Sequence, residues 1–143
     1  MNILILHGPN LNLLGDREPE IYGTTTLAEI NTELFSIAST QNTELRAFQS
    51  NHEGVLIDLI HQFRKWATGI IINPGAYTHY SYALRDALST FSGPIFEVHL
   101  SDITKRESFR THSVLQGLPN IQRIMGQGPN GYYEALRRLI ARP

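Results

Sequence analysis

The sequence predicts one doubly wound α/β domain, in which helices cover both faces of a five-stranded parallel sheet. Three observations lead to this fold class. Apolar runs alternate with segments of helical periodicity along the 143 residues, most of the runs are apolar on both faces, and no linker or repeat interrupts them. Strands buried on both faces belong to parallel sheets covered by helices. Five of them in one domain of this length indicate a flavodoxin-like arrangement over residues 1–143.

Each element has its own signal in the sequence. Residues 2–7, 44–50, 69–73, 94–99 and 121–125 are expected as strands, since they are short and largely apolar. Helices are expected from 27 to about 37, around 56–63, over 82–91 and over 132–141, where apolar residues recur at helical spacing. Thr26 and Glu29 fit a capping box at the first of these helices. The polar segment 104–113 is expected to be a helical connection.

Composition excludes several classes of function. The chain has 12 Lys+Arg against 13 Asp+Glu and no basic block, so we expect no nucleic-acid partner. The absence of cysteine excludes disulfides, a thiolate nucleophile and cysteine-ligated metal. No apolar run approaches the roughly 18 residues of a membrane span. The N-terminus has no signal-peptide core, and we therefore expect a cytoplasmic protein without a membrane partner.

Residues 7–23 (HGPNLNLLGDREPEIYG) form the most informative segment. Glycine, proline, asparagine and aspartate are dense enough here to break regular structure. The segment also holds Arg17 and Tyr22, which are costly to order. A long ordered loop that leaves the end of a strand is a common place for an active site, although a surface loop without chemistry is the plain alternative.

Polar side chains also follow the third and fourth predicted strands. A doubly wound sheet binds its ligand beyond the carboxyl ends of the strands, at the point where the strand order reverses. Asn73 and His79 follow the third strand, and Glu97, His99 and Ser101 close the fourth. Together with the loop after the first strand, these segments supply two kinds of candidate general acid–base residue, tyrosine and histidine. They also supply several amides and arginines, but no obvious nucleophile or metal cage.

Pairs within this set suggest acid–base chemistry. A guanidinium such as that of Arg17 would favour the phenolate form of Tyr22, the form that acts as a base. Glu97 and His99 are two residues apart on a strand, so the carboxylate can orient the imidazole as a general acid. Taken singly, each of these residues is at least as often a packing or solvated side chain.

Other polar groups suggest how an anionic ligand would be held. Arg106 and Arg110 are spaced to share one helical face, where they could hold an anion. Asn10 and Asn73 are uncharged donors suited to a developing enolate. The run Gly126–Gly131 has the spacing of a dinucleotide-binding loop, but it follows the last strand and reads as a turn before a helix.

Over essentially its full length the chain resembles the type II 3-dehydroquinases (3-dehydroquinate dehydratases). The matching stretches are GPNLNLLGDREPEIYG, NHEG at 51–54, INPGAYTH at 72–79, ALRDAL at 83–88, EVHLSD at 97–102, RESFRTHS at 106–113 and GQGPNGY at 126–132. The resemblance implies a flavodoxin-like fold and the trans elimination of water from 3-dehydroquinate to 3-dehydroshikimate, without metal or organic cofactor. The pathway implied is shikimate biosynthesis, or alternatively quinate catabolism.

The resemblance also assigns residues. Tyr22 would be the base, Arg17 its activator, and Asn10 the residue that holds a water against the enolate oxygen. His99 would protonate the departing hydroxyl, and Glu97 would orient it. Substrate contacts would come from Asn73, His79, Ser101 and Arg110 and from the backbone at Leu100 and Ser101. Arg106 would help to close the loop 11–23 over the substrate.

The family's usual assembly is a dodecamer built as a tetramer of trimers, in which Asp86 would reach the site of a neighbouring subunit. Among the departures from the family pattern, Asp102 stands where asparagine is common and adds charge near the carboxylate site, so substrate affinity is the property it would affect. Two alternatives remain: a flavodoxin-like module that binds FMN or acts as a receiver, and a non-catalytic relative that serves in assembly.

Overall fold

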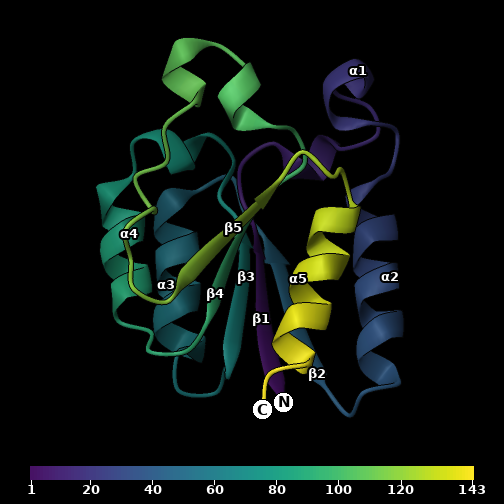
Figure 1. The fold of residues 1–143 in the computed structure, drawn as a ribbon, viewed down its shortest axis with the longest axis vertical. Coiled ribbons are helices and arrows are strands. Elements are labelled where there is room, and N and C mark those ends of the chain that lie inside the picture. Colours follow the sequence, from purple (N-terminus) through teal and green to yellow (C-terminus); the bar gives the residue numbers. More distant parts are fainter.

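The computed structural model describes residues 1–143 and has the predicted sheet. All five strands are parallel, in the order β2-β1-β3-β4-β5 (Figure 1). Their bounds are β1 (Asn2–His7), β2 (Glu44–Gln49), β3 (Gly69–Asn73), β4 (Ile95–His99) and β5 (Ile121–Met125). This is the strand order of a flavodoxin-like doubly wound sheet, so the predicted fold class is confirmed.

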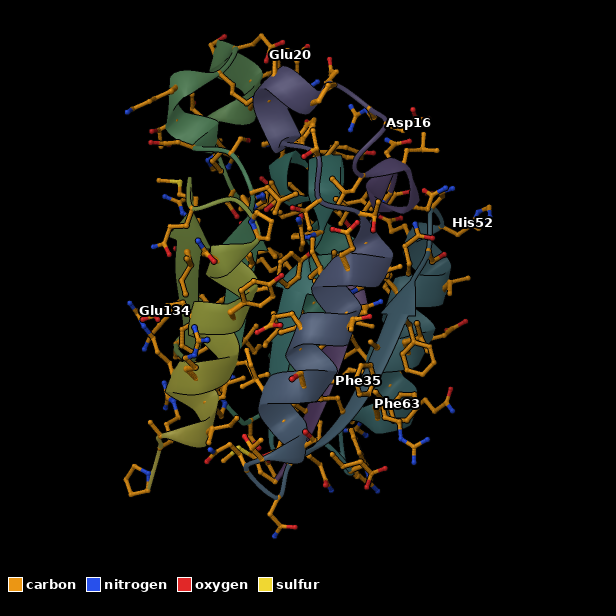
Figure 2. All side chains as sticks on the ribbon, turned by 90° about the vertical axis from the view of Figure 1, so that its right-hand side faces the viewer. Asp16, Glu20, Phe35, His52, Phe63 and Glu134 are labelled. Carbon is orange, nitrogen blue, oxygen red and sulfur yellow. The ribbon has the colours of Figure 1, made fainter.

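Four helices cover the two faces of the sheet. Helices α2 (Leu27–Ser39) and α5 (Asn130–Ile140) lie side by side on one face (Figure 2), and α3 (Glu53–Phe63) and α4 (Tyr82–Ser89) cover the other. Successive residues of β1 divide between two cores, because side chains alternate along a strand. Ile3 and Ile5 pack toward α2 and α5, whereas Leu4 and Leu6 pack toward α3 and α4. None of the helices combines the length and apolar composition that a membrane crossing requires.

Side-chain caps fix where two of the helices begin. The Thr26 Oγ1 atom accepts a hydrogen bond from the Glu29 amide at 3.2 Å, and Ser81 Oγ accepts one from the Leu84 amide at 3.0 Å. Each bond satisfies an amide that has no partner within the helix. The Glu29 side chain makes no return bond, so only half of the predicted capping box forms.

Two connections differ from expectation. The loop after β1 contains a 3₁₀ turn, η1 (Leu11–Leu13), and a single helical turn, α1 (Pro19–Tyr22). Pro19 is the first helical residue of α1, a position that needs no amide donor. The expected helical connection over 104–113 is instead two separate 3₁₀ turns, η3 (Ile103–Lys105) and η4 (Ser108–Arg110), because Arg106 between them has extended backbone.

Three loops meet beyond the carboxyl ends of β1, β3 and β4, where α1 and the turns η3 and η4 lie at the same end of the molecule (Figure 1). A fourth 3₁₀ turn, η2 (Gly75–His79), follows β3. Gly8 passes so close to the start of this turn that a Cβ atom there would lie 2.6 Å from the Pro74 carbonyl carbon. Only glycine permits this approach, which joins the loop after β1 to the loop after β3.

Candidate active site

A pocket opens at this end of the sheet, and the empty space within it, including the part open to solvent, is about 510 Å³. The fifteen residues that line it are Pro9, Asn10, Leu11, Arg17, Tyr22, Asn73, Gly75, Ala76, His79, His99, Leu100, Ser101, Ile103, Arg106 and Arg110. Every site residue that the sequence suggested is among them except Glu97 and Asp86. The loops after three separate strands therefore converge on one site, as the rule for doubly wound sheets predicts.

Tyr22 lies at the end of α1 between two arginines. The Arg106 Nη1 atom donates a hydrogen bond to the Tyr22 hydroxyl at 2.8 Å, and its guanidinium carbon lies 5.3 Å from the ring centroid. The Arg17 guanidinium carbon lies 5.1 Å from the same centroid, and Arg17 also pairs with Glu18 at 3.5 Å. The cation that contacts the phenol oxygen is thus Arg106, for which the sequence suggested anion binding and loop closure but no contact with Tyr22.

His99 and Glu97 form the predicted pair at the end of β4. The His99 Nε2 atom donates to Glu97 Oε2 at 2.6 Å, and both side chains are almost wholly buried. Because a carboxylate accepts hydrogen bonds, Nε2 carries a hydrogen, and Nδ1 is the nitrogen left for exchange with a ligand. The carboxylate therefore sets both the tautomer and the orientation of the ring.

Three further donors that sequence reasoning missed also bind Glu97. Thr78 Oγ1 and Ser113 Oγ donate to its Oε2 atom at 2.7 and 2.9 Å, and Gln116 Nε2 donates to Oε1 at 2.7 Å. Burial acts to raise the pKa of Glu97, but the bonds from His99, Thr78 and Gln116 outweigh it and hold the pKa below its usual value. Glu97 is therefore a buried carboxylate that stays ionised.

Neutral amides occupy the side of the pocket nearest β1 and β3. Asn10 has left-handed backbone, φ 68°, and its amide donates to Asn51 Oδ1 at 2.9 Å. Asn73 is buried, and its Oδ1 atom accepts from the Gly75 amide at 3.1 Å, so its side-chain nitrogen remains as a donor. Asn51 belongs to a stretch that matched the family pattern, but no site role had been predicted for it.

His79 and Arg110 line the pocket beside His99. The His79 Nδ1 atom donates to the His112 carbonyl at 2.7 Å. Burial lowers the pKa of His79, with smaller contributions from the nearby charges of His99 and Arg110, so its neutral form is favoured. Arg110 Nε lies 2.9 Å from Glu107 Oε2 as an ion pair, but the two groups are not aligned as a hydrogen bond.

Asp86 and Asp102, the residue that departs from the family pattern, both lie outside the pocket of this single chain. Asp86 is exposed on α4, so a place for it in a site requires a second chain. Asp102 follows Ser101 but accepts hydrogen bonds from the Thr104 amide and hydroxyl at 3.0 and 2.6 Å, and these bonds lower the pKa of its carboxyl. No group of three or more His, Asp or Glu side chains is arranged to hold a metal ion.

The site as a whole is built for proton transfer on a small anion. A phenol bonded to a guanidinium and an imidazole bonded to a carboxylate are a candidate base and a candidate acid in one pocket. Arg17, Arg106 and Arg110 supply positive charge suited to a carboxylate. Fold and site together define an α/β protein whose pocket holds the groups that general acid–base catalysis requires.

Comparison with known proteins identifies the family. The family model described as Dehydroquinase class II matches residues 1–140. The chain is 56% identical over 140 residues to the 3-dehydroquinate dehydratase of Bordetella avium, covering 97% of this chain and 96% of the relative. It is 52% identical over 141 residues to that of Pelotomaculum thermopropionicum, covering 99% and 97%.

Solved structures agree with this assignment. The crystal structure of the type II dehydroquinase from Butyrivibrio crossotus superposes with a TM-score of 0.93 at 45% identity, and the match covers 97% of both chains. The chain belongs to the class II dehydroquinase family.

Proposed function

We propose that this class II dehydroquinase eliminates water from 3-dehydroquinate, with Tyr22 as the base and His99 as the acid. The observation that carries the proposal is the pairing of these two groups in one pocket, each bonded to the charged partner that its role requires. The Arg106 guanidinium donates a hydrogen bond to the Tyr22 hydroxyl, with Arg17 beside the same ring, and the Glu97 carboxylate accepts one from His99.

The reaction needs no more than these two proton transfers and a stabilised enolate. Tyr22 removes the proton alpha to the ketone, and the electron pair of the C–H bond moves into an enolate. The enolate re-forms the ketone as the bond to the β-hydroxyl breaks, and the hydroxyl leaves as water with the proton from His99. Tyr22 then carries one additional proton and His99 has lost one, so a transfer through solvent restores the starting state.

The remaining pocket residues hold the substrate in this proposal. Asn10 and Asn73 supply neutral side-chain amides close to where enolate charge develops. His79, Arg110 and the backbone at Leu100 and Ser101 bind the ring hydroxyls and the carboxylate. The bond between Arg106 and Tyr22 joins α1 to the segment after β4, so it closes the loop 11–23 over the ligand and excludes water.

The test is to mix the protein with 3-dehydroquinate and a chelator and follow the ultraviolet absorbance of the conjugated enone product. Tyr22→Phe and His99→Ala should each reduce kcat by more than about 100-fold, because each removes a proton-transfer group. Binding of a substrate analogue should change far less. Tyr133→Phe, on α5 and outside the pocket, is the matched control. Near-normal turnover by Tyr22→Phe would exclude Tyr22 as the base.

We also propose that the chain assembles as a dodecamer, a tetramer of trimers, in which Asp86 completes the site of a neighbouring subunit. An interface on α4 is supported by Tyr80 and Tyr82, which are 60% and 65% exposed near the start of the helix that carries Asp86. Light scattering would measure the mass, and a monomer would contradict the proposal. We further propose that the enzyme is cytoplasmic, which cell fractionation would test. We also propose that it serves shikimate biosynthesis rather than quinate catabolism, which deletion of its gene would test.

A further inference from the structure

The carboxylate that orients His99 is held by a segment that follows η4 rather than by its own strand. Residues 113–116, here called the strap, contact Glu97 on β4. The two strap residues that bind it, Ser113 and Gln116, follow it by 16 and 19 residues in the sequence. Ser113 Oγ lies within 3.0 Å of both Glu97 oxygens, and it accepts a hydrogen bond from the Leu115 amide at 3.2 Å. The Ser113 hydroxyl oxygen accepts from the Leu115 amide, and the hydroxyl hydrogen is directed to the Glu97 carboxylate.

Gln116 supplies the second strap donor. Its Nε2 atom reaches inward to Glu97 Oε1 at 2.7 Å, whereas the residue as a whole is exposed. Glu97 itself has no exposed surface. Ser113 and Gln116 are thus neutral donors that replace the water from which the carboxylate is excluded.

Helix α4 fixes the backbone of the strap. Arg85 Nη1 donates to the carbonyls of Val114 and Gln116 at 2.5 and 2.8 Å, and the Val114 amide donates to the Thr78 carbonyl at 2.8 Å. The strap is therefore anchored between α4 and η2, and its two side-chain donors have a defined position relative to Glu97.

We propose that the strap is a positioning element for His99: Ser113 and Gln116 keep Glu97 an anion and so hold the acid proton on the imidazole, and Arg85 keeps the strap in place. The inference rests on the proposed role of His99 as the acid. Without the strap donors, the carboxylate would be a better proton acceptor than it is with them. A proton that moves from Nε2 to Glu97 leaves a neutral imidazole, which is a weaker acid than imidazolium.

The other charges that face the pair come from two elements. His79 on η2 and Arg110 on η4 are close enough to influence one another and the Glu97–His99 pair. The strap side chains in contact with Glu97 are neutral, and Arg85 binds strap carbonyls. A variant of the strap therefore changes hydrogen bonds to Glu97 without removing a charge from the site.

The experiment compares the pH profiles of kcat for wild type, Ser113→Ala and Gln116→Leu. Each variant loses one hydrogen bond to a charged group, so we expect kcat to fall about tenfold and KM to change less than about twofold. Because the bonds favour the charged carboxylate, their loss should move the acid limb of the profile about one unit to higher pH. Profiles that superpose on wild type would overturn the proposal.

Controls separate this effect from a general loss of stability. Ser36→Ala on α2 and Gln62→Leu on α3 make the same chemical changes at exposed positions far from the strap, and their profiles should match wild type. If Gln116→Leu does not fold, Ser113→Ala decides the question, since it removes a single oxygen atom. Arg85→Met should lower kcat in the same direction without touching Glu97, and an unchanged kcat would remove Arg85 from the proposal.

A readout independent of turnover distinguishes failure of this inference from failure of the proposed function. Carboxyl-labelled glutamate allows Glu97 to be titrated by ¹³C NMR, with its signal assigned from Glu97→Gln. The pKa of Glu97 should rise in Ser113→Ala and Gln116→Leu even if no dehydration were observed. An unchanged Glu97 titration in both variants would reject the strap as the support of the anion, whatever the activity.

Discussion

Two buried histidines occupy equivalent places in the fold but have opposite surroundings. His7 ends β1 and His99 ends β4, and they are 0% and 5% exposed. His7 Nε2 donates to Asn31 Oδ1 at 2.8 Å, and its Nδ1 accepts from the Tyr132 hydroxyl at 3.0 Å. His99 has the Glu97 carboxylate at 2.6 Å. The two histidines thus share a position at the end of a strand, and they differ in the charge of the side chain to which each is hydrogen-bonded.

The difference in partners determines what each imidazole can do. Burial lowers the pKa of His7 from 6.5 to about 4, and the hydrogen bond with Asn31 opposes this only in part. His7 is therefore neutral at physiological pH and joins β1 to α2 and α5 as a structural residue. At His99, by contrast, the interaction with the imidazole helps to keep the Glu97 carboxylate ionised. A buried histidine becomes a proton carrier where a stabilised anion is bonded to it.

The largest expected effect comes from removing that anion. Glu97→Gln retains the shape but gives His99 a neutral partner like that of His7, and we expect kcat to fall about 1000-fold. The side-chain amide of the introduced glutamine also places an NH₂ group, which cannot accept a hydrogen bond, against donors that bound a carboxylate oxygen of Glu97. Turnover is measured through the enone absorbance.

Glu33→Gln, at an exposed site on α2, is the control and should retain full activity. If Glu97→Gln kept kcat within about tenfold of wild type, a neutral partner would suffice and the contrast with His7 would lose its functional meaning.

The next effect concerns stability, and it tests His7. A folded-state pKa of about 4 against 6.5 in the unfolded chain means that the unfolded state binds the additional proton as the pH falls between these values. The free energy of unfolding should therefore decrease by about 3 kcal/mol from pH 6.5 to 4, at up to about 1.4 kcal/mol per pH unit. Urea unfolding at one fixed protein concentration measures it.

His7→Leu should abolish most of this slope and separate the contribution of His7 from that of His79, whose pKa is also lowered by burial. A slope of the same size in the variant would assign the proton to another group. The pKa of Glu97 is lowered as well, so its contribution has the same sign but falls at lower pH: its stabilisation is present above 4.5 and is lost only as the pH drops further.

The positions of the strand ends that carry the two histidines could be predicted from the sequence, because strand bounds follow from local patterns. The five strands match expectation to within one residue, since apolar runs and turn residues are local signals. The single turn α1 was missed although its signal is also local: Pro19 begins it, and Gly23 follows it with φ 79°.

The partners of the site residues could not be read in the same way. Arg106 bonds to Tyr22 across 84 residues, and Gln116 bonds to Glu97 across 19. A threonine, serine or glutamine carries no pattern that distinguishes a donor to a buried carboxylate from a solvated side chain. The residues that make contact with a ligand follow from strand ends, whereas the residues that tune them depend on how distant loops pack.

The smallest expected effect would convert one histidine environment toward the other. Asn31→Asp places a carboxylate where His7 Nε2 now has a neutral acceptor at 2.8 Å, so the pKa of His7 should rise from about 4. Asn31 is only half-buried, and we therefore expect a rise of about one unit, at the low end for an adjacent opposite charge. Titration of ¹⁵N-labelled histidine by NMR measures it, with Asn42→Asp, an equal change of net charge at an exposed turn, as the control. An unchanged His7 titration would mean that burial alone sets its pKa, and that the charge of the partner is not what separates His7 from His99.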